Sequence, residues 1–226
     1  MLYNSCFICY STSNYSQLAS QCLKTIKEMG IDEKDIYHRL DDVECKNIKT
    51  EFQSKFWYNC VINKIEHLVN TLENVKEKYK YFIMSDCDIQ YNRQNKHHCI
   101  KLEQYINDNE NNLFFMQEFN KNLVNTGFII IKNNKIDHTI NFFRKCFDIL
   151  KKKDQIKKKY PYGDQSVINK LLKNYKFSFI PNKFVVWGNH IYNKRRALLH
   201  HSVCAKNIKE KLEQMEIIKK QLNRNL

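Results

Sequence analysis

The segment Lys80–Ser85 (KYFIMS) constrains the fold more than any other part of this sequence. It is too short and too apolar for a surface helix, and a run of this kind is typical of a strand buried on both faces. Such strands occur where helices cover both sides of a sheet. Other short apolar runs in the chain alternate with segments of helical periodicity, which is the pattern of an α/β layered domain.

The same alternation predicts the remaining elements. A first strand is expected at Cys6–Ser11, followed by a polar turn and a helix at Tyr15–Met29 with Gly30 in the position of a C-terminal cap. Further strands are expected at Asp35–Leu40, Asn112–Gln117, Gly127–Lys132, Lys176–Ile180 and Lys183–Trp187, with a related segment at Ala197–His201. Further helices are expected at Thr50 to about Lys78, where Thr50 and Gln53 resemble a capping box, at about His98–Asn107, Lys135–Lys152 and Asp164–Lys173, and from about Lys206.

Length and charge limit the number of domains and the kind of partner. A chain of 226 residues can bury one substantial core, and 4 glycines and 2 prolines leave little material for linkers, so we predict one domain. Lys and Arg (38) exceed Asp and Glu (24), giving +14, which favours phosphate-bearing partners without choosing between nucleotides, nucleic acid and acidic membranes. We interpret the lysine-rich stretch Lys151–Lys159 as a solvated helix end and loop rather than a polyanion site.

Cysteine usage and hydropathy predict where the protein works. The 9 cysteines are scattered without zinc-site spacing, which favours free thiols in a reducing compartment. Cys6 and Cys9 form a CxxC pair, but residues three apart on a strand point to opposite faces, which disfavours a redox or metal site. We find no secretion signal and no apolar run of about 18 residues, the length of a membrane span. We therefore expect a cytoplasmic protein, and a viral protein in the host-cell cytoplasm fits equally.

Two carboxylates, Asp86 and Asp88, directly follow the buried strand. Ligands bind at the carboxyl ends of strands in open α/β sheets, and carboxylate oxygens suit a hard divalent cation such as Mg²⁺ or Mn²⁺. One of the two carboxylates could instead support the metal ligands or bind a sugar hydroxyl. An acidic turn without a ligand is the alternative, and other segments of the sequence weigh against it.

In this Asp-x-Asp pair and in four further segments the chain resembles the nucleotide-diphospho-sugar transferases of the GT-A type. The four segments, in the order that the family has them, are Phe7–Tyr15, Asn125–Ile130, Gly163–Asn169, and His200–His201 followed by Lys206. Each motif is short; their number, order and spacing, from about residue 5 to residue 206, carry the resemblance. It implies one GT-A (Rossmann-like) domain over residues 1–226, with a mixed central sheet flanked by helices. Its parts would be a nucleotide-binding half at about 1–90, a sugar and acceptor half at about 91–205, and a C-terminal helix at about 206–226.

The resemblance also implies which residues bind the donor. Thr12 and Tyr15, in the turn after the first strand, would contact the base and ribose of uridine or guanosine, although an ordinary polar turn is an open alternative. Lys64 on the long helix would lie near the donor phosphates, as Lys55 also would, while solvent exposure explains either lysine equally well. Lys206 would neutralise the departing diphosphate.

Two further segments would hold the sugar. Asn125 and Gly127 would shape its pocket, since an amide both donates and accepts hydrogen bonds and glycine lets a ligand approach the backbone. A turn before an edge strand is the alternative. Asp164 and Gln165 would be the acidic and amide pair beneath the reacting sugar. N-capping of the predicted helix would also explain Asp164.

A histidine would complete the metal site. Within the pair His200–His201 we prefer His201, because the metal-binding histidine of the family directly precedes small or apolar residues, as Ser202 and Val203 are here. His200 stays open as the ligand. Adjacent residues on a strand point in opposite directions, so one of the two histidines is structural.

These roles imply a metal-dependent glycosyltransferase. It would move a hexose or pentose from a UDP- or GDP-sugar, with UDP favoured, to a hydroxyl of a glycan or another acceptor, with a retaining outcome. Asp88 would hold Mn²⁺ or Mg²⁺ with Asp86 and His201, and Asp86 would also contact the donor. Asp164 would stabilise the positive sugar centre or orient the acceptor, while Gln165 positions hydroxyls.

Two other classes compete with this prediction. Phosphatases of the haloacid dehalogenase type share an Asp-x-Asp after an apolar strand, but Gln90 and Ile168 break their pattern. A non-enzymatic nucleic-acid-binding domain would explain the positive charge and the aromatic residues beside Lys55. No recognised nucleic-acid module occurs, and the acids cluster where a groove should be basic, so we expect no nucleic-acid partner.

Overall fold

A mixed six-stranded sheet forms the centre of the computed structural model, which describes residues 2–42, 54–118, 122–152, 160–187, 197–203 and 207–223. In spatial order its strands are β2 (Ile36–Asp41), β1 (Ser5–Thr12), β3 (Tyr81–Ser85), β6 (Val124–Lys132), β5 (Leu113–Gln117) and β7 (Ser178–Phe179). The strands β2, β1 and β3 are parallel, β6 runs antiparallel to both β3 and β5, and β7 is parallel to β5.

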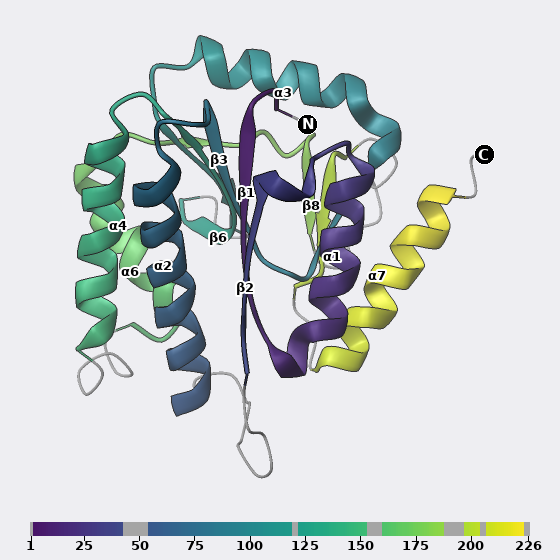
Figure 1. Ribbon diagram of the computed structural model, residues 1–226, viewed down its shortest axis with the longest axis horizontal. Helices are drawn as coiled ribbons and strands as arrows, with labels where there is room; N and C mark the ends of the chain where they lie inside the picture. The colour runs from purple at the N-terminus through teal and green to yellow at the C-terminus, as the bar shows by residue number, and fades with distance from the viewer. Residues whose placement is uncertain are drawn as a thin grey trace.

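Helices cover both faces of this sheet (Figure 1), which confirms the predicted α/β class. One face carries three helices that pack on one another, α2 (Lys55–Val75), α4 (Ile136–Lys151) and α6 (Gly163–Leu171). The other face carries α1 (Ser16–Glu28) and α3 (Lys96–Asp108), and α7 (Ile208–Asn223) lies beside α1. Short 3-10 turns occupy Ser13–Tyr15, Glu33–Asp35, Arg93–Asn95 and Leu172–Asn174.

Each central strand contributes to two separate apolar cores, because successive side chains of a strand point to opposite faces. In β3, Phe82 and Met84 pack toward α2 and α4, whereas Tyr81 and Ile83 pack toward α1 and α3. All residues of β3 are buried, which confirms that this run is a strand covered on both sides. The burial fixes the strand's register and therefore where its carboxyl end lies.

The cysteines follow the same alternation. Cys6 faces the core beneath α2 and Cys9 faces the core beneath α1, so the CxxC pair lies on opposite sides of the sheet, as predicted. No disulfide joins the cysteines in the described ranges. Burial raises the pKa of the Cys6 and Cys146 thiols well above the ordinary range, which keeps them protonated and unreactive.

A bulge interrupts the pairing of β5 with β6. Phe115 pairs with Ile129, but the next residue of β5, Met116, pairs with Asn125. Residues 126–128 of β6 are therefore left out of the β5 ladder, although Phe128 still pairs with Ser85 of β3. Bulges bend a strand and redirect its side chains. Here the bulge redirects the stretch of β6 that lies beside the end of β3.

A second, three-stranded sheet returns the late part of the chain to the end of β3. Its order is β4 (Ile89–Tyr91), β9 (Leu199–His201), β8 (Val185–Trp187). β4 pairs antiparallel with β9, so Ile89 lies opposite His201. The sequence predicted β8 and the β9 segment but missed β4, because its three residues lie between the polar residues Asp88 and Asn92 and show no apolar run.

The start of α2 depends on a signal that the sequence analysis did not use. Ser54 is the N-cap, and its hydroxyl accepts the Trp57 backbone N–H at 3.1 Å. The capping box predicted at Thr50 and Gln53 lies outside the described residues. At the end of α1 the prediction was right, since Gly30 has a φ of +86° and its N–H closes the last turn on the Lys27 carbonyl.

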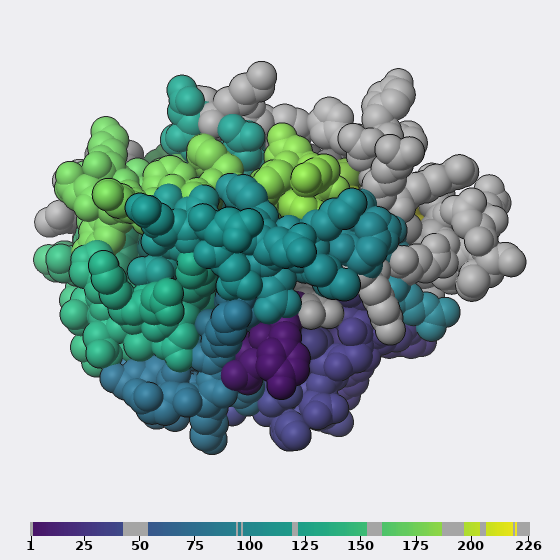
Figure 2. All heavy atoms as spheres, turned by 90° about the horizontal axis from the view of Figure 1, so that it is seen from above, coloured from purple at the N-terminus to yellow at the C-terminus, as the bar shows by residue number. Residues whose placement is uncertain are grey.

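The end of the molecule at the start of β1 is covered by α3, which crosses it in teal in Figure 2 beside the purple N-terminal residues. Polar side chains are instead collected at the other end, where β1 and β3 finish. Within the described ranges no helix combines the length and the apolar stretch needed to cross a bilayer.

Replacing Ser54 with Ala should lower the free energy of unfolding by about 1 kcal/mol, because the Trp57 N–H loses its cap. Urea denaturation followed by circular dichroism measures this. Ser20→Ala removes the same hydroxyl from an exposed position inside α1, where alanine favours the helix, and should cost nothing. Equal losses for both variants would contradict the assigned cap.

Candidate functional site

A pocket of about 320 Å³ opens at the carboxyl ends of β1 and β3. Because these strands are parallel and adjacent, the segments that follow them meet at one edge of the sheet. The structure brings ten of the predicted site residues into the lining of this pocket: Thr12, Tyr15, Lys64, Asp86, Asp88, Asn125, Gly127, Asp164, Gln165 and His201. Lys206 lies outside the described residues.

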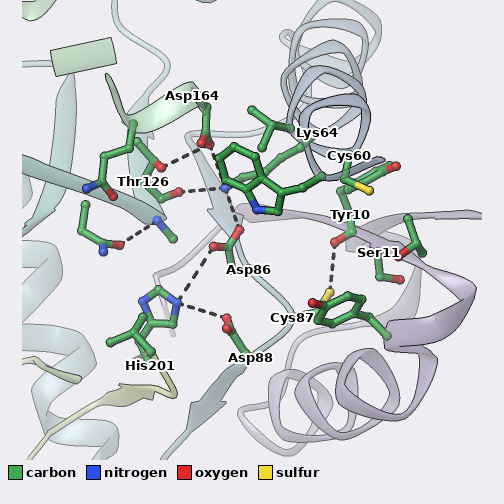
Figure 3. Close-up of a pocket in the computed structure, with 18 of the residues that line it drawn as sticks. Tyr10, Ser11, Cys60, Lys64, Asp86, Cys87, Asp88, Thr126, Asp164 and His201 are labelled. Carbon is green, nitrogen blue, oxygen red and sulfur yellow. Dashed lines mark hydrogen bonds and ion pairs between the residues drawn. The ribbon is translucent and has the colours of Figure 1, made fainter. Parts of the chain in front are cut away.

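His201 faces the two carboxylates of the Asp-x-Asp pair (Figure 3). Its Nε2 lies 3.0 Å from Oδ1 of Asp88 and 3.9 Å from Oδ2 of Asp86. One possible ligand atom from each of the three residues lies within 4.8 Å of the others, a spacing that a single metal ion can bridge. Cys87 points away from this cluster, and its thiol donates to the Tyr10 carbonyl at 3.3 Å.

Backbone hydrogen bonds hold the cluster at both ends. The Asp86 N–H donates to the Gly127 carbonyl at 2.7 Å, which continues the pairing of β3 with β6 past the end of β3. The Ser202 N–H donates to the Asp88 carbonyl at 2.9 Å, which continues the pairing of β4 with β9. Two sheets therefore fix the three side chains relative to one another.

The chemistry of this cluster fits a divalent cation. Asp88 Oδ1 is buried 3.0 Å from His201 Nε2, and the other ring nitrogen, His201 Nδ1, is buried and makes no hydrogen bond. A buried polar atom without a hydrogen-bond partner costs free energy unless a ligand binds it. Two carboxylates and an imidazole also form a suitable ligand set for Mn²⁺ or Mg²⁺.

Lys211, which was not predicted, keeps Asp88 ionised. Burial by itself would raise the pKa of Asp88, but the Lys211 ammonium and the neighbouring His201 outweigh burial and hold that pKa well below its usual range. Lys211 pairs with Asp88 Oδ2 from the first turn of α7. The carboxylate is thus in the form that binds a cation. Lys211 belongs to no short motif, so only the fold could reveal it.

Lys64 links the cluster of Asp86, Asp88 and His201 to Asp164, the other acid of the pocket. Its Nζ lies 2.7 Å from Asp86 Oδ1 and 3.0 Å from Asp164 Oδ2, and it donates to the Thr126 carbonyl at 3.3 Å. Burial would lower the pKa of Lys64, but Asp164 and Asp86 outweigh it and raise that pKa. All three donors of the ammonium are therefore directed at the protein. The other candidate lysine, Lys55, is exposed and lies outside the pocket lining.

Asp164 does not cap its helix, so the capping alternative is wrong. The N-cap of α6 is Tyr162, and no side chain caps that end. Asp164 is buried in the first turn, and its Oδ2 accepts the Thr126 hydroxyl at 3.1 Å in addition to the Lys64 ammonium. The carboxylate faces the pocket rather than the end of the helix (Figure 3).

Asn125 and Gln165 are tied together by a residue that was not predicted. Glu118 Oε2 accepts the Asn125 amide at 3.0 Å and the Gln165 amide at 3.1 Å. The side-chain oxygen of Asn125, Oδ1, accepts the Gly127 N–H at 2.9 Å. Asn125 lies inside β6, an interior strand, which replaces the alternative of a turn before an edge strand. The side-chain amides of Asn125 and Gln165 are thereby held in fixed orientations on one wall of the pocket.

The turn after β1 forms the opposite side of the pocket. Thr12 is buried and donates to the Asn14 side chain, and Tyr15 is partly buried in the 3-10 turn that follows. Burial raises the pKa of Tyr15, so its hydroxyl stays protonated. The neighbouring Tyr10 donates to Asp41 at 2.8 Å, which fixes another aromatic ring of the lining.

Gly127 makes room for the histidine. A Cβ at this position would lie 2.1 Å from His201 Cε1 and 2.8 Å from its Nδ1. The glycine therefore admits the imidazole ring, whereas we expected from the sequence that it would admit a ligand. His200 pairs with Gln90 of β4, alternates to the other face of β9, and is absent from the described lining.

The family comparison agrees with this geometry. The profile of the nucleotide-diphospho-sugar transferase family matches residues 20–215. No curated protein matches the chain significantly in sequence.

Solved structures show the same fold. A glycosyltransferase involved in glycosylation of the major capsid of the virus PBCV-1 has a TM-score of 0.65 and 13% identity, covering 94% of this chain and 99% of that one. The glycosyltransferase GlyE of Streptococcus pneumoniae TIGR4 has a TM-score of 0.56 and 14% identity, covering 98% of this chain and 63% of GlyE. At these identities the likeness concerns the fold alone.

Replacing Gly127 with Ala should weaken Mn²⁺ binding at least tenfold, because the new methyl group displaces the His201 ring. Electron paramagnetic resonance of free Mn²⁺ measures the affinity. Gly30→Ala is the matched control: its Cβ meets nothing within 4 Å, but its φ of +86° strains the backbone, so it should lower stability and leave Mn²⁺ affinity unchanged. Unaltered Mn²⁺ binding in Gly127→Ala would contradict a role for His201 as ligand.

Proposed function

This chain belongs to the nucleotide-diphospho-sugar transferase family, and from that membership we propose that it is a metal-dependent glycosyltransferase. The donor would be a nucleotide-diphosphate-sugar, with UDP favoured over GDP, and the acceptor a hydroxyl of a glycan or another molecule. The nucleotide would bind in the half at about 1–90 and the sugar and acceptor in the half at about 91–205. The observation that carries the proposal is the convergence of Asp86, Asp88 and His201 on one point at the end of β3.

Asp86, Asp88 and His201 would hold the cation. When bound, a Mn²⁺ or Mg²⁺ ion supplies a charge that offsets the charge developing on the diphosphate leaving group. The residues that would bind the cation are preorganised. Asp88 is buried and ionised, and the backbone hydrogen bonds of Asp86 and Ser202 fix its surroundings. A fixed group costs no reorganisation at the moment of reaction.

The nucleoside would lie against the turn after β1. Thr12 and Tyr15 border this part of the pocket, with Tyr10 beside them. Protonated tyrosine hydroxyls can donate to the base or ribose, and aromatic rings can stack on the base. This arrangement supports a nucleotide orientation with the base toward β1 and the diphosphate toward the Asp-x-Asp pair.

The sugar would lie between the Asp-x-Asp pair and the start of α6. In this arrangement Asp164 would be close to the region where positive charge develops as the bond to the diphosphate breaks, and its carboxylate would stabilise that charge. Asn125 and Gln165, oriented by Glu118, can hold sugar hydroxyls. Lys64 would act by holding Asp86 and Asp164 at a set separation, because its donors are directed at the protein.

The pairing of the acids supports a retaining outcome. The carboxylates in the described pocket lining are Asp86, Asp88 and Asp164, and each lies next to an ammonium group. An ammonium that pairs with a carboxylate competes with an acceptor hydroxyl for the carboxylate oxygens. Inversion needs a dedicated base on the acceptor side, whereas retention does not.

The competing classes fit less well. A phosphatase of the haloacid dehalogenase type would need an acid where Ile168 is buried in the core of this structure. A nucleic-acid groove should be basic, but the pocket is lined by three carboxylates. Membership of a sugar-transferase family gives neither class support.

Replacing Asp88 with Asn should lower nucleoside-diphosphate release from the preferred donor by about 100- to 1,000-fold, because the cation loses its buried carboxylate. A panel of UDP- and GDP-sugars with Mn²⁺ identifies that donor. Asp108→Asn makes the same change at an exposed position on α3 and should leave release unchanged. Release that survives both Asp88→Asn and removal of metal by EDTA would refute metal dependence.

Asp164→Asn tests the catalytic assignment. We expect kcat to fall about 100-fold with a much smaller change in donor KM, because the carboxylate acts on charge present only in the transition state. Asp148→Asn on α4 is the matched control and should be active. Thermal unfolding checks that Lys64 tolerates the loss of one partner. A variant with parental kcat would remove Asp164 from the mechanism.

A further inference from the structure

Lys211 reaches the site from a part of the chain that no motif marks. It lies in the first turn of α7, whose start is fixed where the Glu210 N–H donates to the Asn207 side chain at 2.9 Å. Further along α7, Met215 and Ile218 are buried, and the helix packs on α1 and β4. The helix axis is thereby anchored, while the lysine side chain lines the pocket with 22% of its surface exposed.

The two oxygens of Asp88 have separate tasks. Oδ2 is paired with the Lys211 ammonium, whereas Oδ1 lies 3.0 Å from His201 Nε2. Among the residues that the structure describes, Asp88 is the one carboxylate with which Lys211 forms an ion pair. Lys211 therefore already supplies Asp88 with a positive charge before any metal arrives.

The net charge of the pocket shows how the Lys211 ammonium affects cation binding. Three carboxylates (Asp86, Asp88, Asp164) and two ammonium groups (Lys64, Lys211) line the described pocket, a balance of one negative charge. A divalent cation alone would reverse that balance and would meet the Lys211 charge at short range. A cation together with a diphosphate diester, which has one negative charge on each phosphate, leaves the balance as it was.

We propose that Lys211 is the resident counter-cation of Asp88 before ligands bind and that it turns to the donor diphosphate when cation and donor bind together. This rests on the proposed function. The move needs only the lysine side chain, because α7 stays anchored by Met215 and Ile218. Lys211 lies within electrostatic reach of Tyr15, on the nucleoside side of the pocket, so the ammonium borders the path between Asp88 and the nucleotide.

The enzyme should therefore bind its cation weakly in the absence of nucleotide and tightly in its presence. Lys211 opposes a lone cation at Asp88 and favours a cation that arrives with a diphosphate. Removing the ammonium should therefore change the two affinities in opposite directions. A lysine that only supports the fold of α7 would not produce this reversal.

The test uses the full chain with Lys211→Met, which keeps the length of the side chain, and with Lys211→Arg, which keeps its charge. Lys209→Met, at an exposed position of the same helix turn, is the matched control. Mn²⁺ alone is titrated by electron paramagnetic resonance. UDP and GDP are titrated by calorimetry at saturating Mn²⁺, and circular dichroism confirms folding of each variant.

We expect Lys211→Met to bind Mn²⁺ alone at least tenfold more tightly than the parent and the nucleoside diphosphate at least tenfold more weakly. Lys211→Arg and Lys209→Met should stay near the parent in both titrations. Weaker or equal Mn²⁺ binding by Lys211→Met would contradict the role of Lys211 as counter-cation of Asp88. Unchanged diphosphate binding would contradict its move to the donor diphosphate. A parent that binds neither UDP nor GDP would contradict the proposed function instead, while the Mn²⁺ titration would still decide the counter-cation.

Discussion

The site depends on keeping three carboxylates close together at the end of a buried strand. Asp86, Asp88 and Asp164 would repel one another in a partly buried pocket, because charges interact strongly where water is scarce. Lys64 lies between Asp86 and Asp164, and Lys211 binds Asp88, so each acid has a neighbouring ammonium group. The lysines offset the charge of the acids and hold them in place, which makes a strongly acidic site compatible with a stable fold.

Backbone pairing then decides where these charges lie. The antiparallel pairing of β3 with β6, together with the bulge opposite Met116, brings Thr126 and Gly127 beside Asp86. The pairing of β4 with β9 brings His201 beside Asp88 from a segment more than a hundred residues later. Because Gly127 has no side chain, the imidazole fits between the two sheets. The proposed metal cluster is therefore a product of two sheets meeting at one edge.

Much of this could be predicted from the sequence because the informative patterns are local. The apolar run before Asp86 gave the buried strand, and the alternation of elements gave the α/β class. The motifs after β1 and β3 converged because these parallel strands end at the same edge of the sheet, where the antiparallel β6 begins. What the sequence did not predict depends on long-range geometry. β4 shows no apolar run, Lys211 and Glu118 belong to no motif, and the role of Gly127 depends on a ring that arrives from β9.

The central claim is that Asp86, Asp88 and His201 hold a divalent cation for a nucleotide-diphosphate donor. Anomalous diffraction at the manganese edge, from crystals grown with Mn²⁺ and UDP or GDP, tests it most directly. The account predicts one strong peak within ligand distance of all three side chains, with the diphosphate beside it. A peak elsewhere, or bound nucleotide with no metal between these residues, would contradict it.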